Sequence, residues 1–141
     1  MLATNPNLFV YGSLLFAIGH PTGERLRSEA RLLGAASIPG RLYRVSWYPG
    51  LAQAEAGSAR VHGEVYALAD PARSLAWLDD YESIVPGEEV DNEYVRVERP
   101  VQLASGREIT AWVYLYQKDV TGLELVADGR WVAAVCPDPG T

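Results

Sequence analysis

The segment Tyr11-Gly12-Ser13-Leu14 is the first place in the chain where backbone groups could do chemistry. The apolar run Leu8-Phe9-Val10 before it has the composition of a buried strand, and Gly12 interrupts that strand. Successive amide N–H groups after such a break can turn toward one point and bind a carboxylate or a developing oxyanion. An ordinary turn at a strand end has the same composition, so spacing alone leaves both interpretations open.

Glu82 is the second candidate, because it lies at or near the C-terminal end of the strongest predicted helix. That end of the helix dipole disfavours an anion and raises a carboxyl pKa. Trp77 and Tyr81 could raise it further by removing water. A carboxyl group that titrates near neutrality suits general acid/base catalysis, whereas a solvated glutamate at a helix end is the alternative.

Other chemistries have weaker support in the sequence. The remaining acids near Glu82 lack the spacing of a calcium loop and favour a solvated charge run; they are Glu88, Glu89, Asp91 and Glu93. His20 and His62 share no ligand spacing with each other or with a carboxylate, and we expect no metal and no organic cofactor. Ser13 has no G-x-S-x-G elbow around it, and neither a dinucleotide fingerprint nor a P-loop is present.

The elements that must position these candidates are mostly strands. Alternation predicts a strand over residues 60–68, with Val61, Val65 and Ala67 on one face. Two longer strands, over residues 94–103 and 108–116, are joined by a turn at 104–107 into a hairpin. A further strand is expected over residues 41–45, followed by a turn at Tyr48-Pro49-Gly50.

Two helices complete the pattern. Asp70 is a good N-cap and Pro71 suits the first helical position, and Ala72, Leu75 and Leu78 form an inward stripe. A shorter helix is expected over residues 24–33, between a breaker cluster at 20–23 and Gly34. We therefore predict an α+β fold, a curved or barrel-like mixed sheet with one or two flanking helices.

Bulk properties narrow the class of protein. The 141 residues suit a single domain over 1–141, and the net charge of −6, from 12 basic and 18 acidic residues, argues against nucleic acid as a partner. The lone Cys136 forms no internal disulfide, and the N-terminal residues do not resemble a secretory signal. No apolar run is long enough to span a bilayer, so we expect no membrane partner. The use of one cysteine fits a reducing compartment, and we expect a cytoplasmic location. The sequence leaves its oligomeric state open.

Taken together, these segments resemble the γ-glutamylcyclotransferase family, in particular its avirulence-induced-gene-like bacterial members. The segments that carry the likeness follow one another over nearly the whole chain: Leu8 to Leu14, Tyr48-Pro49-Gly50, Val61-His62-Gly63-Glu64-Val65-Tyr66, Leu78-Asp79-Asp80-Tyr81-Glu82, Tyr94-Val95-Arg96, Ala111-Trp112-Val113-Tyr114 and Gly129-Arg130-Trp131. Most members of the family have glycine directly after the glutamate, and Ser83 stands at that position here.

The resemblance implies a small mixed β-barrel and an enzyme, of transferase or lyase type, that cyclises a small γ-glutamyl amine or amino acid to 5-oxoproline. It implies that Glu82 is the acid/base, that Tyr11, Gly12, Ser13 and Leu14 bind substrate, and that Tyr81 and Tyr114 shape the pocket. The identity of the leaving amine stays open. A non-catalytic binding module that keeps the family cavity is the alternative, and the Ser83 departure motivates it.

Overall fold

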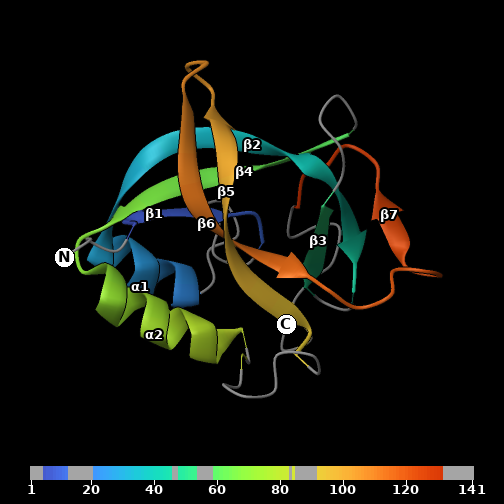
Figure 1. The fold of residues 1–141 in the computed structure, drawn as a ribbon, viewed down its shortest axis with the longest axis horizontal. Coiled ribbons are helices and arrows are strands. Elements are labelled where there is room, and N and C mark those ends of the chain that lie inside the picture. Colours follow the sequence, from blue (N-terminus) through green and yellow to red (C-terminus); the bar gives the residue numbers. More distant parts are fainter. Residues whose placement is uncertain are drawn as a thin grey trace.

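The computed structural model describes residues 5–12, 21–45, 48–53, 59–82, 84 and 92–131. Their elements in chain order are β1 (Asn7–Val10), α1 (Pro21–Glu29), β2 (Ala30–Arg44), β3 (Pro49–Gln53), β4 (Arg60–Leu68), α2 (Pro71–Tyr81), β5 (Tyr94–Leu103), β6 (Glu108–Tyr116) and β7 (Glu124–Val126). Five of the strands close into a mixed barrel, with extra strands and two helices beside it (Figure 1). The predicted α+β barrel is confirmed.

The barrel runs in the order β2-β4-β1-β6-β5 and closes where β5 returns to β2 at Ala36↔Leu103 and Ser37↔Gln102. Only the β1–β6 pairing among these described strands is parallel; the other pairings are antiparallel. Residues 8–10 of β1 are all buried, on both faces of the strand. A strand with both faces covered is one that has the barrel interior on one side and packed elements on the other.

Close backbone approach explains the glycine in the middle of β4. A side chain at Gly63 would place its Cβ 2.0 Å from the carbonyl oxygen of Val10. Since no Cβ fits at that distance, Gly63 allows β4 to lie against the last residue of β1. This contact fixes the point at which the chain leaves β1 and enters Tyr11 and Gly12.

The half of β2 that extends beyond the barrel carries two more strands. Leu42 pairs with Leu51 of β3 on one side and with Val126 of β7 on the other. Figure 1 shows β3 and β7 gathered at this end of β2, away from the helices. The start of β3 contributes to the candidate site described below.

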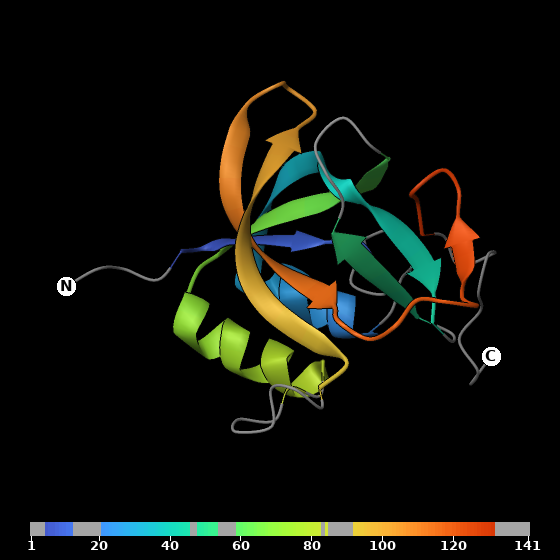
Figure 2. The ribbon, with the colours of Figure 1, turned by 45° about the vertical axis from the view of Figure 1, so that its right-hand side comes forward.

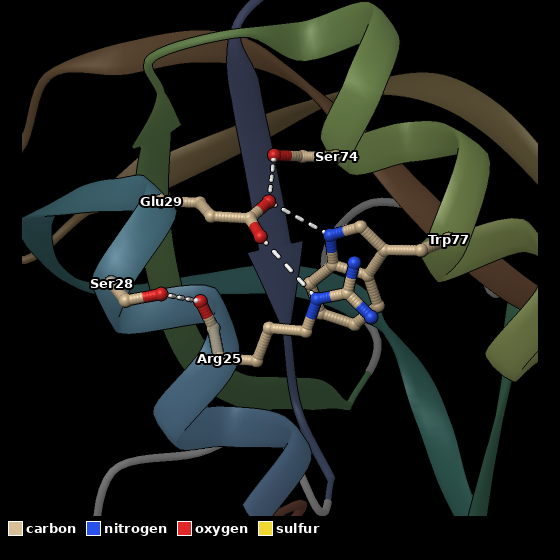
Figure 3. A network of polar contacts seen from close by, with 5 residues as sticks. All are labelled: Arg25, Ser28, Glu29, Ser74 and Trp77. Atoms are coloured by element: carbon tan, nitrogen blue, oxygen red, sulfur yellow. Dashed lines mark hydrogen bonds and ion pairs between the residues drawn. The ribbon is translucent and has the colours of Figure 1, made fainter.

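Helices α1 and α2 lie side by side along one flank of the barrel (Figures 1 and 2). A network of polar contacts joins them, in which Glu29 Oε1 accepts hydrogen bonds from Ser74 Oγ at 2.7 Å and Trp77 Nε1 at 2.8 Å (Figure 3). Arg25 pairs with Oε2 of the same carboxylate at 3.3 Å and also lies over the Trp77 ring. No helix in the described part of the chain has the length and apolar character needed to span a bilayer.

Several predicted elements match the structure to the residue. The strands over 60–68, 94–103 and 108–116 and the turn at 104–107 are confirmed as β4, β5, β6 and their connection. Asp70 is the N-cap of α2, and its carboxylate accepts a hydrogen bond from the Arg73 amide at 3.3 Å. Pro71 occupies the first turn, as predicted.

The prediction for residues 24–33 was wrong at both ends. The helix begins at Pro21, inside the predicted breaker cluster, because proline is well tolerated in a first helical turn. It ends at Glu29, and residues 30–33 already belong to β2, which continues through the strand predicted at 41–45. Leu32 and Leu33, at the end of the predicted helix, are exposed at the bulge where β2 pairs with β4. Pairing with β4 therefore outweighs local helix preference.

Two smaller corrections concern the inward face of α2 and the predicted turn at residues 48–50. Ala72 is exposed, and Ser74 takes the inward position next to Leu75 and Leu78, since its hydroxyl donates to Glu29. Of the turn predicted at Tyr48-Pro49-Gly50, Pro49 and Gly50 belong to strand β3, which begins at Pro49, and Tyr48 lies at a bend just before it. The Val45 amide donates to the Tyr48 carbonyl at 3.1 Å.

Candidate functional site

Glu82 caps the C-terminal end of α2, where the sequence predicted it. Its amide still donates to the Leu78 carbonyl at 2.9 Å, so the helix holds its backbone. Burial, followed by the negative charges of Asp79 and Glu93, raises the pKa of Glu82 from 4.5 to about 7. A carboxyl group with such a pKa can both accept and donate a proton near neutral pH.

The negative charge of Glu82 affects the pKa of four tyrosine hydroxyls. Burial is the first cause that raises the pKa of Tyr11, Tyr48, Tyr94 and Tyr114, and the negative charge of Glu82 contributes in all four cases. These tyrosines come from the end of β1, the start of β3, β5 and β6. The barrel and the neighbouring strand β3 thus bring segments that are distant in sequence within electrostatic range of the end of α2.

Tyr11 is buried, and its hydroxyl forms hydrogen bonds with backbone groups of the protein. The hydroxyl donates to the Tyr114 carbonyl at 2.5 Å and accepts from the Leu51 amide at 3.3 Å, which ties β3 to β6. Gly12 lies against Pro49, where an added Cβ would be 3.0 Å from the proline Cγ. Ser13 and Leu14 lie outside the described residues, so the predicted amide nest stays a prediction.

Tyr114 is buried and lies in a polar network between α2 and the barrel. Its hydroxyl donates to Asp79 Oδ1 at 2.7 Å. Arg96 of β5 binds the same carboxylate with two nitrogens, Nε to Oδ1 at 2.7 Å and Nη2 to Oδ2 at 3.1 Å. The guanidinium also lies 4.4 Å from the centre of the Trp112 ring. This network holds the last turn of α2, and hence Glu82, against β5 and β6.

A second group of aromatic side chains lies beside Glu93, just before β5. The Tyr48 hydroxyl donates to the Glu93 carboxylate, at 2.9 Å to Oε1 and 3.1 Å to Oε2. The Tyr94 ring lies 6.3 Å from that of Tyr48 and 5.6 Å, edge to face, from that of Tyr116. A Cβ at Gly50 would meet Tyr116 Cγ at 2.7 Å, so glycine there makes room for this ring against β3.

Sequence reasoning gave no role to five residues near Glu82: Tyr48, Asp79, Glu93, Tyr94 and Arg96. The signal for some of them was present, since Asp79 lies three residues before Glu82 and therefore on the same helix face. Glu93 was interpreted as part of a solvated charge run, and it is exposed, but its carboxylate is also held by Tyr48. Ser83 and the acids at 88, 89 and 91 lie outside the described residues.

Metal ligands do not gather in the part of the chain that the structure describes, where no three side chains of His, Cys, Asp or Glu could hold one ion. His62 is on β4, and burial, then the charges of Arg130 and Arg60, lowers its pKa. His20 and Cys136 lie outside the described residues. The absence of a metal from the chemistry therefore stays a prediction.

A family model described as "Gamma-glutamyl cyclotransferase, AIG2-like" matches residues 8–133. The chain belongs to this family. It is 38% identical over 126 residues to the γ-glutamylcyclotransferase family protein YtfP of Escherichia coli K12, a match that covers 89% of this chain and 95% of that protein. The resemblance stated from the sequence is confirmed.

Solved structures agree on the fold. The solution structure of Escherichia coli YtfP has a TM-score of 0.60 at 35% identity, over 92% of this chain and 98% of that one. The crystal structure of an AIG2-like protein from Mus musculus has a TM-score of 0.69 at 21% identity, over 96% and 91% of the two chains. At that lower identity the mouse protein supports the fold alone.

Proposed function

We propose that this protein is an active γ-glutamylcyclotransferase that converts a small γ-glutamyl amine or γ-glutamyl amino acid to 5-oxoproline and a free amine. The observation that carries the proposal is the pKa of Glu82, raised to about 7 at the end of α2 by burial and by Asp79 and Glu93. Family membership supplies the reaction class, and the YtfP relatives carry the same family name.

The reaction needs no covalent nucleophile from the enzyme. A γ-glutamyl compound carries its own, the α-amine, whose attack on the γ-carbonyl carbon closes a five-membered lactam. An enzyme that folds the substrate so that the amine faces the carbonyl recovers much of the effective molarity of an intramolecular reaction. Positioning is therefore the first task of the site.

Proton transfer is the second task, and we assign it to Glu82. The ionised carboxylate takes one proton from the substrate α-ammonium, and the free amine then forms the new C–N bond. The tetrahedral intermediate collapses with cleavage of the old C–N bond, while the Glu82 carboxylic acid returns its proton to the leaving nitrogen. The attacking nitrogen loses its second proton and the leaving amine takes one up, so the protons balance. A pKa near 7 suits both directions.

Stabilising the oxyanion and the α-carboxylate is the third task. We assign it to the backbone amides of Gly12, Ser13 and Leu14, which follow directly on β1 and Tyr11. Support comes from the placement of Tyr11 and Gly12. The Tyr11 side chain bonds to β3 and β6, and its pKa is raised in part by the Glu82 charge. Gly12 lies against Pro49 at the start of β3. Tyr114 and Tyr81 are assigned to the pocket wall.

Replacing Glu82 with glutamine tests the assignment, since glutamine keeps the shape and removes the base. We expect 5-oxoproline release from the best γ-glutamyl substrate of the wild type to fall by roughly a hundredfold or more, with substrate affinity largely kept. Near wild-type turnover by Glu82→Gln would refute the role of Glu82. Tight binding of γ-glutamyl compounds by the wild type without any turnover would favour the binding module instead.

A further inference from the structure

Glu93 places a second carboxylate beside the site, and no cation of the described residues forms an ion pair with it. Its side chain is exposed, but its backbone is fixed, because its carbonyl accepts a hydrogen bond from the Gln117 amide at 2.8 Å where β5 and β6 meet. The Glu93 charge is felt at Glu82, whose pKa it helps to raise. The two carboxylates are therefore electrostatically coupled.

The surroundings of Glu93 are aromatic. Tyr48 orients the carboxylate by donating to both of its oxygens, and the rings of Tyr94 and Tyr116 continue the aromatic wall from Tyr48. The Glu93 charge contributes to raising the pKa of all three tyrosines. Because their hydroxyls stay protonated near neutrality, they add no negative charge. The Tyr48 hydroxyl already donates to Glu93 and the Tyr94 hydroxyl to the Pro49 carbonyl at 2.6 Å, so the contribution of these two side chains is their aromatic rings.

This combination matches one kind of ligand group. A carboxylate attracts a cation at short range, and tyrosine rings attract cations through their π faces. An anionic group would be repelled by this carboxylate and an apolar group would gain nothing from it, whereas an ammonium group combines hydrogen-bond donation with charge attraction. No ion pair of the described residues involves Glu93, so a cationic group of the substrate is a natural partner for its carboxylate.

We propose that Glu93, together with Tyr48, Tyr94 and Tyr116, forms a subsite for an ammonium group of the substrate. The inference rests on the proposed function, since it places this ammonium next to the assigned base, Glu82. A γ-glutamyl substrate offers two sources for the group. One is the α-ammonium of the γ-glutamyl moiety itself, and the other is a cationic substituent on the leaving amine.

Three substrates that differ in the charge of the leaving group separate these sources. The γ-glutamyl amides of 1,4-diaminobutane, pentylamine and 4-aminobutanoic acid end in an ammonium, a methyl and a carboxylate at comparable chain length. We would measure KM and kcat for each with the wild type, with Glu93→Gln and with Glu108→Gln. Glu108 is a matched control, because it is an exposed glutamate at the other end of the same β5–β6 hairpin.

A leaving-group subsite predicts a KM about tenfold lower for the cationic substrate than for the neutral one, a preference that Glu93→Gln removes and Glu108→Gln keeps. A subsite for the α-ammonium predicts instead that Glu93→Gln raises the KM of all three substrates by a similar factor of about ten. Both effects should weaken as salt is raised. Unchanged KM values for all three substrates in Glu93→Gln would overturn the proposal.

Binding measurements make the test independent of turnover. Calorimetric titration of the three amides into Glu82→Gln, and into a variant that combines it with Glu93→Gln, reports on the subsite even if no reaction occurs. Glu93-dependent binding without turnover in the wild type would retain the subsite and reject the proposed reaction. Turnover in the wild type, with binding that does not depend on Glu93, would support the proposed reaction and reject the subsite. Tyr48→Phe, which keeps the ring but loses the hydrogen bond, should give a smaller effect than Glu93→Gln.

Discussion

At the scale of single residues, the raised pKa of Glu82, which suits acid/base catalysis, lowers the stability of the folded protein at neutral pH. Its pKa is raised in the folded protein because burial and two neighbouring acids disfavour the charged form. The folded state therefore binds the Glu82 proton more tightly than the unfolded chain does. Stability falls as pH rises from about 4.5 toward 7, and stays at the lower level above that.

Glu82→Gln is accordingly expected to stabilise the protein at pH 8. The rise in pKa from 4.5 to about 7 corresponds to roughly 3 kcal/mol as an upper bound. The gain should shrink toward zero as pH falls to about 5, where the wild-type carboxyl is already largely protonated. Urea unfolding of both proteins at pH 5 and pH 8 measures the difference. Equal stabilities at both values would mean that Glu82 is not held in a destabilising environment.

The same pKa predicts a pH dependence of the proposed reaction. Because the base must be ionised, kcat/KM should fall as pH drops through about 7. Glu93→Gln removes one of the charges that raise the pKa, so its acid limb should move to lower pH, while Glu108→Gln should leave it in place. A ¹³C titration of the Glu82 side-chain carboxyl measures the shift directly. A midpoint that stays the same in Glu93→Gln would contradict this electrostatic coupling.

At the scale of elements, the contact between α1 and α2 depends on one carboxylate. Glu29 ends α1, and its two oxygens bind the buried Ser74 hydroxyl, the Trp77 indole and Arg25 (Figure 3). These hydrogen bonds, that from Trp77 first, lower the pKa of Glu29. The network holds the helix that carries Asp79 and Glu82 at a fixed position along the barrel.

Replacing Glu29 with glutamine should lower stability by about 1 kcal/mol at pH 7, since an amide cannot accept from all three partners. The stabilising effect of a carboxyl with a lowered pKa is present above its unfolded pKa and is lost as pH falls through the folded one. The difference between the proteins should therefore narrow below pH 4. Glu24→Gln, on an exposed position of the same helix, should change little.

Elements were predictable where a local pattern agreed with the final environment. Strands β4, β5 and β6 alternate or carry β-branched and aromatic residues, and α2 has its cap and proline in the first turn, so their bounds followed from sequence. The boundary between α1 and β2 did not, because the nearest glycine, Gly34, suggested the helix end, whereas pairing with β4 already makes residues 30–33 strand. Ser74 was missed as an inward residue because its partner, Glu29, is far away in sequence.

At the scale of the whole molecule, barrel closure creates the site. Tyr11, Tyr94 and Tyr114 belong to three barrel strands or their ends, and the closed order of strands brings them within electrostatic range of Glu82. Tyr48 comes from the start of β3, which pairs with the extension of β2. Glu82 and the segment at Tyr11 could be singled out from sequence, because each has a local signature. Tyr48, Glu93 and Arg96 could not be assigned roles, since their partners are set by the fold alone.

The ion pair between α2 and β5 links the stability of the whole fold to the electrostatics of the site. Arg96 binds Asp79 through two hydrogen bonds, and the charge of Asp79 is the largest cause, after burial, of the raised Glu82 pKa. Replacing Arg96 with glutamine leaves the Asp79 charge uncompensated. We expect two consequences, a loss of about 1–2 kcal/mol of stability for this partly exposed pair and a further rise in the Glu82 pKa.

A double-mutant cycle separates these consequences. Asp79→Asn alone should lower the Glu82 pKa and move the acid limb of kcat/KM to lower pH, opposite to Arg96→Gln. In the double variant the charge is gone from both partners, so the stability loss should be smaller than the sum of the single losses. Its Glu82 midpoint, read by ¹³C titration, should follow Asp79→Asn rather than Arg96→Gln. Additive stability losses, or shifts of the midpoint in the same direction in both single variants, would show that this pair does not tune Glu82.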